Sequence, residues 1–129
     1  MTSGKRLSGR VLRCAQNVSH GLGAGFLEKV YENALCIEFT QAGIPFQCQR
    51  QFVISYKGED VGNYIADIVV DDRLLIELKA LSGFSKEHDA QVMNYLKATG
   101  LTVGLLLNFG VTRLGIRRIV WNYDDNTNI

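Results

Sequence analysis

The spacing of apolar residues changes along this chain from a helical period to a strand period, and that change constrains the fold most. Before the only proline, Pro45, apolar residues recur every three or four positions in residues 6–20 and 26–42, which predicts two amphipathic helices. Beyond the proline, alternating or continuous apolar runs predict three strands, a helix and two further strands, at residues 51–58, 63–70, 74–81, 86–100, 102–110 and 115–122.

This order of elements predicts an α/β fold of the mixed α+β kind, with helices flanking a mixed central sheet. Short turns at residues 58–60 and 71–73 favour a meander of three antiparallel strands, and a crossover helix then leads to a strand in the interior of the sheet. Residues 1–129 match the usual size of one domain, and no repeat or linker divides them. We therefore expect a single domain.

The composition says more about the cellular compartment of the protein than about its function. The net charge is +1, so no overall basic field indicates nucleic acid, although a local patch would be enough to bind it. No apolar run approaches the roughly 20 residues of a membrane span, and the first twenty residues lack the apolar centre of a signal peptide. The cysteines Cys14, Cys36 and Cys48 show neither a disulfide framework nor a zinc spacing, which favours small apolar roles in a reducing compartment. We expect a cytoplasmic protein without membrane contact.

Charged residues interrupt the two segments best suited to the middle of the sheet. Asp67 lies in residues 63–70, and Glu77 and Lys79 lie in residues 74–81. Because side chains alternate along a strand, Glu77 and Lys79 are expected on one face, and Asp67 is expected on the same face as Ile65 and Val69.

The length of the turn decides whether the two carboxylates meet. A three-residue loop at 71–73 pairs Val70 with Leu74 and places Asp67 opposite Glu77 on one face of the sheet. A two-residue loop would send the two side chains to opposite faces. We predict the three-residue loop.

Two opposed carboxylates would repel each other unless a cation lies between them, because their Cβ atoms are then only about 5 Å apart. Oxygen ligands of this kind suit Mg²⁺ or Mn²⁺, and Lys79 at the rim could orient a water molecule and stabilise developing negative charge. Those parts suit the hydrolysis of a phosphodiester. The alternative is a diagonal surface salt bridge between Asp67 and Lys79 without any ligand.

The pattern of Asp67 on one strand and Glu77-Leu78-Lys79 on the next resembles the PD-(D/E)XK nuclease superfamily. Ala66 stands where the superfamily name has proline. The following predicted helix carries Gln91 and Tyr95, which is similar to the QxxxY element of the exonuclease-like branch of the superfamily.

Upstream, residues 25–31 read GFLEKVY and match the pattern G-x-x-E-x-x-Y, with Glu28 and Tyr31 at the named positions. This pattern is the signature of the GxxExxY proteins, a bacterial and archaeal family assigned to the same superfamily. The resemblance extends from about residue 8 to residue 121, with every motif in the expected order.

The resemblance implies a restriction-endonuclease-like core and a metal-dependent nuclease, and it assigns roles to particular residues. Mg²⁺ or Mn²⁺ would be held by Asp67, Glu77, Glu28 and the carbonyl group of Leu78. Lys79 would position the attacking water, and Gln91 would orient Lys79 or a phosphate. Tyr31 and Tyr95 are either substrate contacts or core aromatics with a polar tip.

Nucleic-acid binding would also use a local basic rim. Lys86, Arg117 and Arg118 are the candidates for contacts to phosphates. Arginines on an edge strand also protect against aggregation, which needs no ligand. Residues 116–121, IRRIVW, are in addition a candidate contact for a homodimer. The competing function is a catalytically silent nucleic-acid-binding or assembly module on the same fold.

Overall fold

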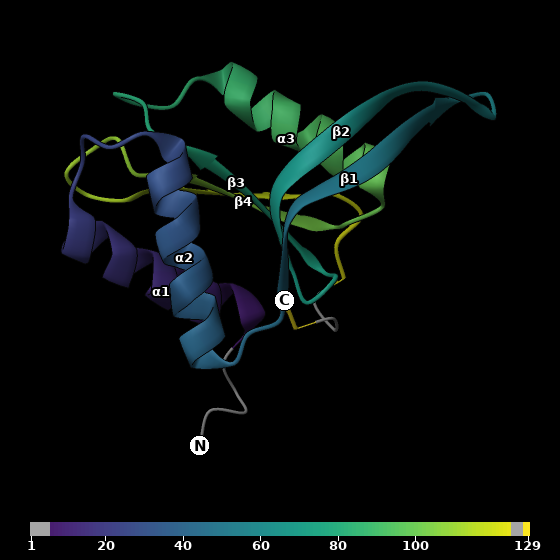
Figure 1. Cartoon of the computed structure of the whole chain (residues 1–129). Helices are drawn as coiled ribbons and strands as arrows, with labels where there is room; N and C mark the ends of the chain where they lie inside the picture. Colours follow the sequence, from purple (N-terminus) through teal and green to yellow (C-terminus); the bar gives the residue numbers. More distant parts are fainter. Residues whose placement is uncertain (1–5, 125–127) are drawn as a thin grey trace.

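The computed structural model describes residues 6–124 and 128–129, and its elements follow the predicted order of two helices, three strands, a helix and two strands (Figure 1). Their bounds are α1 Leu7–Leu22, α2 Glu28–Ala42, β1 Phe46–Tyr56, β2 Glu59–Val70, β3 Leu74–Lys79, α3 Lys86–Thr99, β4 Val103–Asn108 and β5 Gly115–Val120.

The strands form one five-stranded sheet in the order β1-β2-β3-β4-β5. The central pair, β3 and β4, is parallel, and the other three pairs are antiparallel. The parallel pair follows from the crossover through α3, because two parallel neighbours cannot be joined by a tight turn. The predicted mixed α/β fold is confirmed.

Helices cover both faces of this sheet. Helices α1 and α2 pack on one face, where buried side chains such as Val11, Leu35 and Ile76 form the larger apolar cluster. Helix α3 covers the other face, where Leu75 and Leu96 belong to a second cluster (Figure 1). The even and odd positions of β3 thus serve two different cores, which explains its near-continuous apolar sequence.

Local sequence signals set the ends of the helices. Gly43 follows α2 with a positive φ of 70°, which glycine adopts without steric cost, and its N–H caps the carbonyl groups of Phe39 and Thr40. Ser85 begins α3 through a capping box with His88. The second helix begins at Glu28, two residues later than the expected residue 26.

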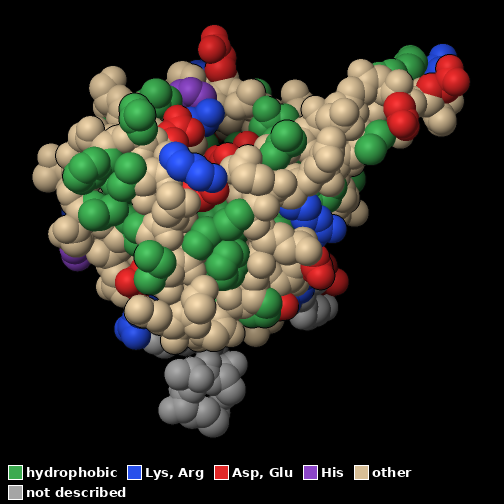
Figure 2. Space-filling model, in the orientation of Figure 1, with side chains coloured by type: hydrophobic (Ala, Val, Ile, Leu, Met, Phe, Trp, Pro, Cys, Tyr) green, Lys and Arg blue, Asp and Glu red, His purple; other side chains and the backbone are tan. Residues whose placement is uncertain are grey.

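The first hairpin differs from the prediction. Its turn consists of Lys57 and Gly58, both with positive φ, so residues 59 and 60 belong to β2 and not to the turn. Two residues in the left-handed region are what a tight hairpin turn requires. The longer strands make the β1–β2 hairpin project from the body of the molecule as an arm (Figures 1 and 2).

The second hairpin has the predicted register. Val70 pairs with Leu74 across the three-residue turn 71–73, and the ladder between β2 and β3 continues to the pair of Ile68 and Ile76. Asp67 is therefore the next residue of β2 and Glu77 the next residue of β3, at the point where the ladder ends.

The alternation of side chains along β2 shifts by one position at Asp67. Tyr64 and Ala66 pack in the cluster on the α3 side, whereas Ile68 and Val70 pack on the α1–α2 side. A regular strand would keep all four of these even-numbered residues on one face. The backbone of β2 thus changes its inward face where the aspartate stands.

This shift corrects the prediction that Ile65, Asp67 and Val69 share one face. Val69 is buried on the α3 side, whereas Ile65 is 52% exposed and lies on the other side of the strand. Gln49 lies opposite Asp67 on β1, its φ is 54°, and the pairing of β1 with β2 skips this position. An irregularity shared by two neighbouring strands leaves no signal in the hydrophobic pattern, so the sequence could not reveal it.

Within the residues that the structure describes, no helix combines the length and the apolar character that a bilayer span needs.

Candidate functional site

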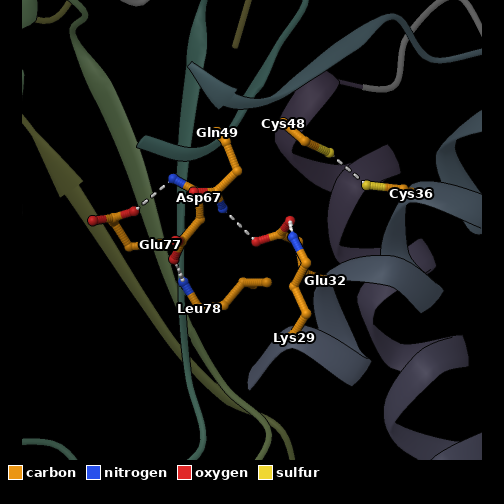
Figure 3. A network of polar contacts seen from close by, with 8 residues as sticks. All are labelled: Lys29, Glu32, Cys36, Cys48, Gln49, Asp67, Glu77 and Leu78. Carbon is orange, nitrogen blue, oxygen red and sulfur yellow. Dashed lines mark hydrogen bonds and ion pairs between the residues drawn. The ribbon is translucent and has the colours of Figure 1, made fainter. Parts of the chain in front are cut away.

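Two carboxylates take the place of backbone partners where β2 and β3 separate. The N–H of Leu78 donates to Oδ2 of Asp67 at 2.8 Å, and the N–H of Asp67 donates to Oε2 of Glu77 at 3.1 Å (Figure 3). Each carboxylate therefore accepts from the backbone of the strand opposite to its own. These reciprocal bonds hold both acids between the strands, against the backbone of Leu78.

Burial makes the negative charge of this pair costly. Glu77 is only 9% exposed, and burial, followed by the charge of Asp67, raises its pKa to about 8. Burial also raises the pKa of Asp67, although the N–H of Leu78 acts in the opposite direction. Both acids thus lie where a nearby positive charge would stabilise them.

The donor set at this position fits a hard divalent cation. It offers two carboxylates, and carboxylate oxygens are ligands that Mg²⁺ and Mn²⁺ take together with retained waters. Across the described part of the chain, no three or more His, Cys, Asp or Glu side chains are arranged to hold an ion. An ion bound here would therefore rest first on Asp67 and Glu77, with water and neighbouring oxygen atoms completing its shell.

Lys79 ends β3 on the same side of that strand as Glu77, as the predicted alternation requires. Its charge is close enough to oppose the rise in the pKa of Asp67. No ion pair within 4.0 Å joins its ammonium group to a carboxylate of residues 6–124 or 128–129. The half-buried amine therefore lies beside the acids without being neutralised by direct contact.

Close packing against β4 fixes the position of Lys79. The N–H of Phe109 donates to the carbonyl group of Lys79 at 2.8 Å. The buried side chain of Asn108 binds both the N–H and the carbonyl group of Leu81, at 2.9 and 3.1 Å. A Cβ atom on Gly110 would lie 2.3 Å from the backbone of Leu81, so only glycine fits there. The backbone from Lys79 to Leu81 is thus held in place by the last residue of β4 and those that follow it.

A third acid approaches the pair from helix α2. Glu32 is 5% exposed, and its charge is among the causes that raise the pKa of Asp67. Gln49 donates to its Oε1 at 2.7 Å, and Lys29 pairs with its Oε2 at 2.8 Å (Figure 3). Acidic and basic side chains gather between α2 and the base of the hairpin arm (Figure 2).

Glu32 is a residue that sequence reasoning missed. The motif points to Glu28, which lies exposed in the first turn of α2. Glu32 follows it by one helical turn and therefore lies on the same side of the helix, nearer the sheet. A glutamate at an otherwise apolar inward position was the available signal.

Tyr64 was missed as well, because its strand changes face at Asp67. Its ring stacks on that of Tyr95, with centroids 3.7 Å apart. Its hydroxyl group is buried close to the carboxylate of Glu77. Burial and then the charge of Glu77 raise its pKa. Tyr95, from the predicted QxxxY element, thus forms an aromatic wall beside the acids through Tyr64.

Two other predicted site residues in the described part of the chain, Gln91 and Tyr31, form no hydrogen bond with Asp67 or Glu77. Gln91 is exposed on α3, and no hydrogen bond or ion pair links it to another residue of the described ranges. Tyr31 is fully buried, where its hydroxyl group donates to the carbonyl group of Gly23 at 2.7 Å and accepts from the N–H of Phe26 at 3.1 Å. It closes the loop before α2, which matches the reading as a core aromatic with a polar tip.

The candidate basic rim is divided between two faces. Arg117 pairs with Asp89 at 2.7 Å on the α3 side, and Arg118, its neighbour on β5, points the other way and lies over the ring of Tyr123. Lys86 is exposed at the start of α3. Lys86 and Arg117 therefore lie on the α3 side of the sheet, and Arg118 does not.

One solved structure shares this fold, and a second shows a weaker similarity. The crystal structure of SSO0001 matches with a TM-score of 0.59 and 16% sequence identity, covering 78% of this chain and 53% of that one. The crystal structure of an alkaline exonuclease from Laribacter hongkongensis matches with a TM-score of 0.44 and 14% identity, covering 93% of this chain and 72% of the exonuclease. This chain thus spans about half the length of SSO0001. No curated protein sequence matches it.

The sequence also matches a family model, that of the PD-(D/E)XK nuclease superfamily, over residues 5–119. The matched range includes both strands that carry the acids, the lysine at the end of β3 and helices α2 and α3. Because the model spans most of the chain, this protein belongs to the PD-(D/E)XK nuclease superfamily.

Proposed function

We propose that this protein is a metal-dependent nuclease that hydrolyses phosphodiester bonds in DNA or RNA. The observation that carries the proposal is the pair of half-buried Asp67 and buried Glu77, fixed by reciprocal hydrogen bonds beside Lys79. A structural role alone would not require two acids to be buried together at the cost of raised pKa values. Membership of the superfamily supports the same conclusion.

Asp67, Glu77 and the carbonyl group of Leu78 would hold Mg²⁺ or Mn²⁺. When bound, the ion would supply Lewis-acid activation of the scissile phosphate and of the attacking water. Glu32 would act from α2, directly or through water, and Glu28 one turn away is the alternative that the sequence motif favours. Either acid adds negative charge at the same edge of the site.

Lys79 would orient the attacking water and stabilise the charge that develops on the phosphate, because its amine is held beside the acids and is not paired with them. Tyr95 and Tyr64 would border the substrate site on its α3 side. Gln91 would contact a phosphate from the exposed surface of α3. Tyr31 would support the loop before α2.

The substrate would be held largely by its backbone. Lys86 and Arg117 on the α3 side are the proposed phosphate contacts, and Arg118 would serve only a strand that passes over the edge of the sheet. A second copy docked on β5, where Ile116 and Val120 are 38% and 40% exposed, would enlarge this surface. The segment GFLEKVY, from Gly25 to Tyr31, supports the finer assignment to the GxxExxY proteins.

A cleavage assay tests the proposal. The full chain is incubated with single- and double-stranded DNA and RNA in Mg²⁺ or Mn²⁺, and again with EDTA. Lys79→Gln is compared with Lys57→Gln, which changes an exposed lysine at the tip of the hairpin arm. We expect cleavage that EDTA abolishes and that Lys79→Gln lowers by about 100-fold or more, while Lys57→Gln stays near the unchanged protein.

Cleavage that persists in EDTA, or that is equal in the two variants, would contradict the proposed mechanism. Binding of a nucleic acid without any cleavage would favour the silent binding module.

A further inference from the structure

Two thiols from different elements lie against each other near the site. Cys36 on α2 and Cys48 on β1 have their sulfur atoms 2.7 Å apart (Figure 3). A disulfide bond is about 2.0 Å long, so the two sulfurs need to approach by only about 0.7 Å to form one. Both cysteines are free thiols in this structure. The sequence analysis expects small apolar roles for the cysteines and does not foresee this contact.

The two thiols differ in access. Cys48 is exposed on β1, whereas Cys36 is partly buried on α2. Burial, followed by the hydrogen bond with Cys48, raises the pKa of Cys36 to about 12, so Cys36 carries little thiolate at neutral pH. The exposed thiol is thus the one that meets a reagent from solution first.

We propose that Cys36 and Cys48 form a redox modification site, at which a low-molecular-weight disulfide converts the two thiols into a bridge between α2 and β1. Cys48 attacks the disulfide reagent and forms a mixed disulfide, releasing the first small thiol. Cys36 then attacks Sγ of Cys48, and the second small thiol leaves. The protein loses two hydrogen atoms and two electrons, and the reagent is reduced to two thiols.

The bridge would join two elements that a polar contact already joins. Glu32 stands one helical turn before Cys36, and Gln49 follows Cys48, so the hydrogen bond from Gln49 to Glu32 lies beside the thiol pair (Figure 3). Oxidation would therefore restrain α2 on β1 in the arrangement seen here and would disturb neither element. Formation of the bridge requires no nuclease activity.

The test uses the full chain, reduced and then treated with oxidised glutathione. Peptides are mapped by mass spectrometry without reduction, and thermal unfolding is followed by circular dichroism before and after treatment. The unchanged protein should yield the Cys36–Cys48 cross-linked peptide, and its Tm should rise by roughly 5–10 °C, because the bridge constrains the unfolded chain between residues 36 and 48. Cys14→Ser, which removes the buried third thiol, should behave in the same way.

Single variants separate the two steps. Cys36→Ser should stop at a stable mixed disulfide between glutathione and Cys48, and Cys48→Ser should react at neither position within the same time. A persistent mixed disulfide in the unchanged protein, a bridge that involves Cys14, or a cross-link between two chains would each overturn the proposal. If the bridge forms but lowers Tm, the disulfide does not fit the packing of α2 on β1 seen in the structure, and the proposal would be contradicted.

Discussion

The strand side and the helix side of the site are held in different ways. On the strand side, backbone pairing of β3 with β4 and the tight contact of Gly110 with Leu81 leave Lys79 no alternative position. On the helix side, Glu32 reaches the site through side-chain contacts with Gln49 and Lys29. The strand side is therefore held by backbone pairing and close packing, and the helix side is held by contacts between side chains.

The largest expected effect comes from Gly110→Ala. A Cβ atom would lie 2.3 Å from backbone atoms of Leu81, so the β3–α3 connection would have to move. We expect a loss of about 3 kcal/mol or more in the free energy of unfolding, measured by urea denaturation. Gly9→Ala in α1, where no atom lies within 4 Å, should stabilise the protein by up to about 1 kcal/mol. Equal effects of the two substitutions would refute the rigid strand side.

The next effect is a dependence of stability on pH that comes from Glu77. Its folded-state pKa of about 8 lies above the ordinary value of 4.5, so the folded protein binds this proton more tightly than the unfolded chain does. That contribution is fully present below pH 4.5 and is lost as the pH rises toward 8. In metal-free buffer, the stability of the unchanged protein should therefore fall relative to Glu77→Gln across this range. Parallel pH profiles for the two proteins would contradict the raised pKa.

The helix side is tested by comparing Glu32→Gln with Glu28→Gln. Glu32 is buried against the site and Glu28 is exposed one turn away, so the first variant should lose about 10- to 100-fold in kcat/KM and the second no more than about threefold. Both variants should keep the unchanged fold by circular dichroism. The reverse order of activities would restore Glu28 as the acid that matters.

The smallest effect is expected at Gln49, whose φ of 54° is unusual for a residue with a side chain. Gln49→Gly removes the contact with Glu32 but suits this backbone, whereas Gln49→Val removes the same contact and adds strain. The valine variant should be less stable than the glycine variant by about 1–2 kcal/mol in urea denaturation. A valine variant as stable as the glycine variant would show that the backbone of β1 adjusts freely.

Much of the strand side could be predicted from the sequence. The register of the second hairpin followed from the length of the 71–73 turn, and the shared side of Glu77 and Lys79 followed from simple alternation. Both are local properties of regular strands, and the chain keeps its regular geometry there. The order of elements was also predictable, because each helix and strand carries its own period.

The helix side could not be predicted in the same way. The motif drew attention to Glu28, while the packing of α2 on the sheet turned Glu32 inward. Tyr64 and Gln49 depend on the irregularity at Asp67, which two strands create together. The contact of Cys36 with Cys48 requires α2 to lie on β1, a tertiary arrangement that cysteine spacing does not encode.

The measurement that tests the central claim most directly is the binding of Mn²⁺ to the full chain by isothermal titration calorimetry at pH 8. The unchanged protein should bind the ion, Asp67→Asn and Glu77→Gln should each weaken binding by about 10-fold or more, and Asp60→Asn in the hairpin arm should leave it unchanged. Equal binding by all four proteins would show that the buried pair of acids is not a metal site.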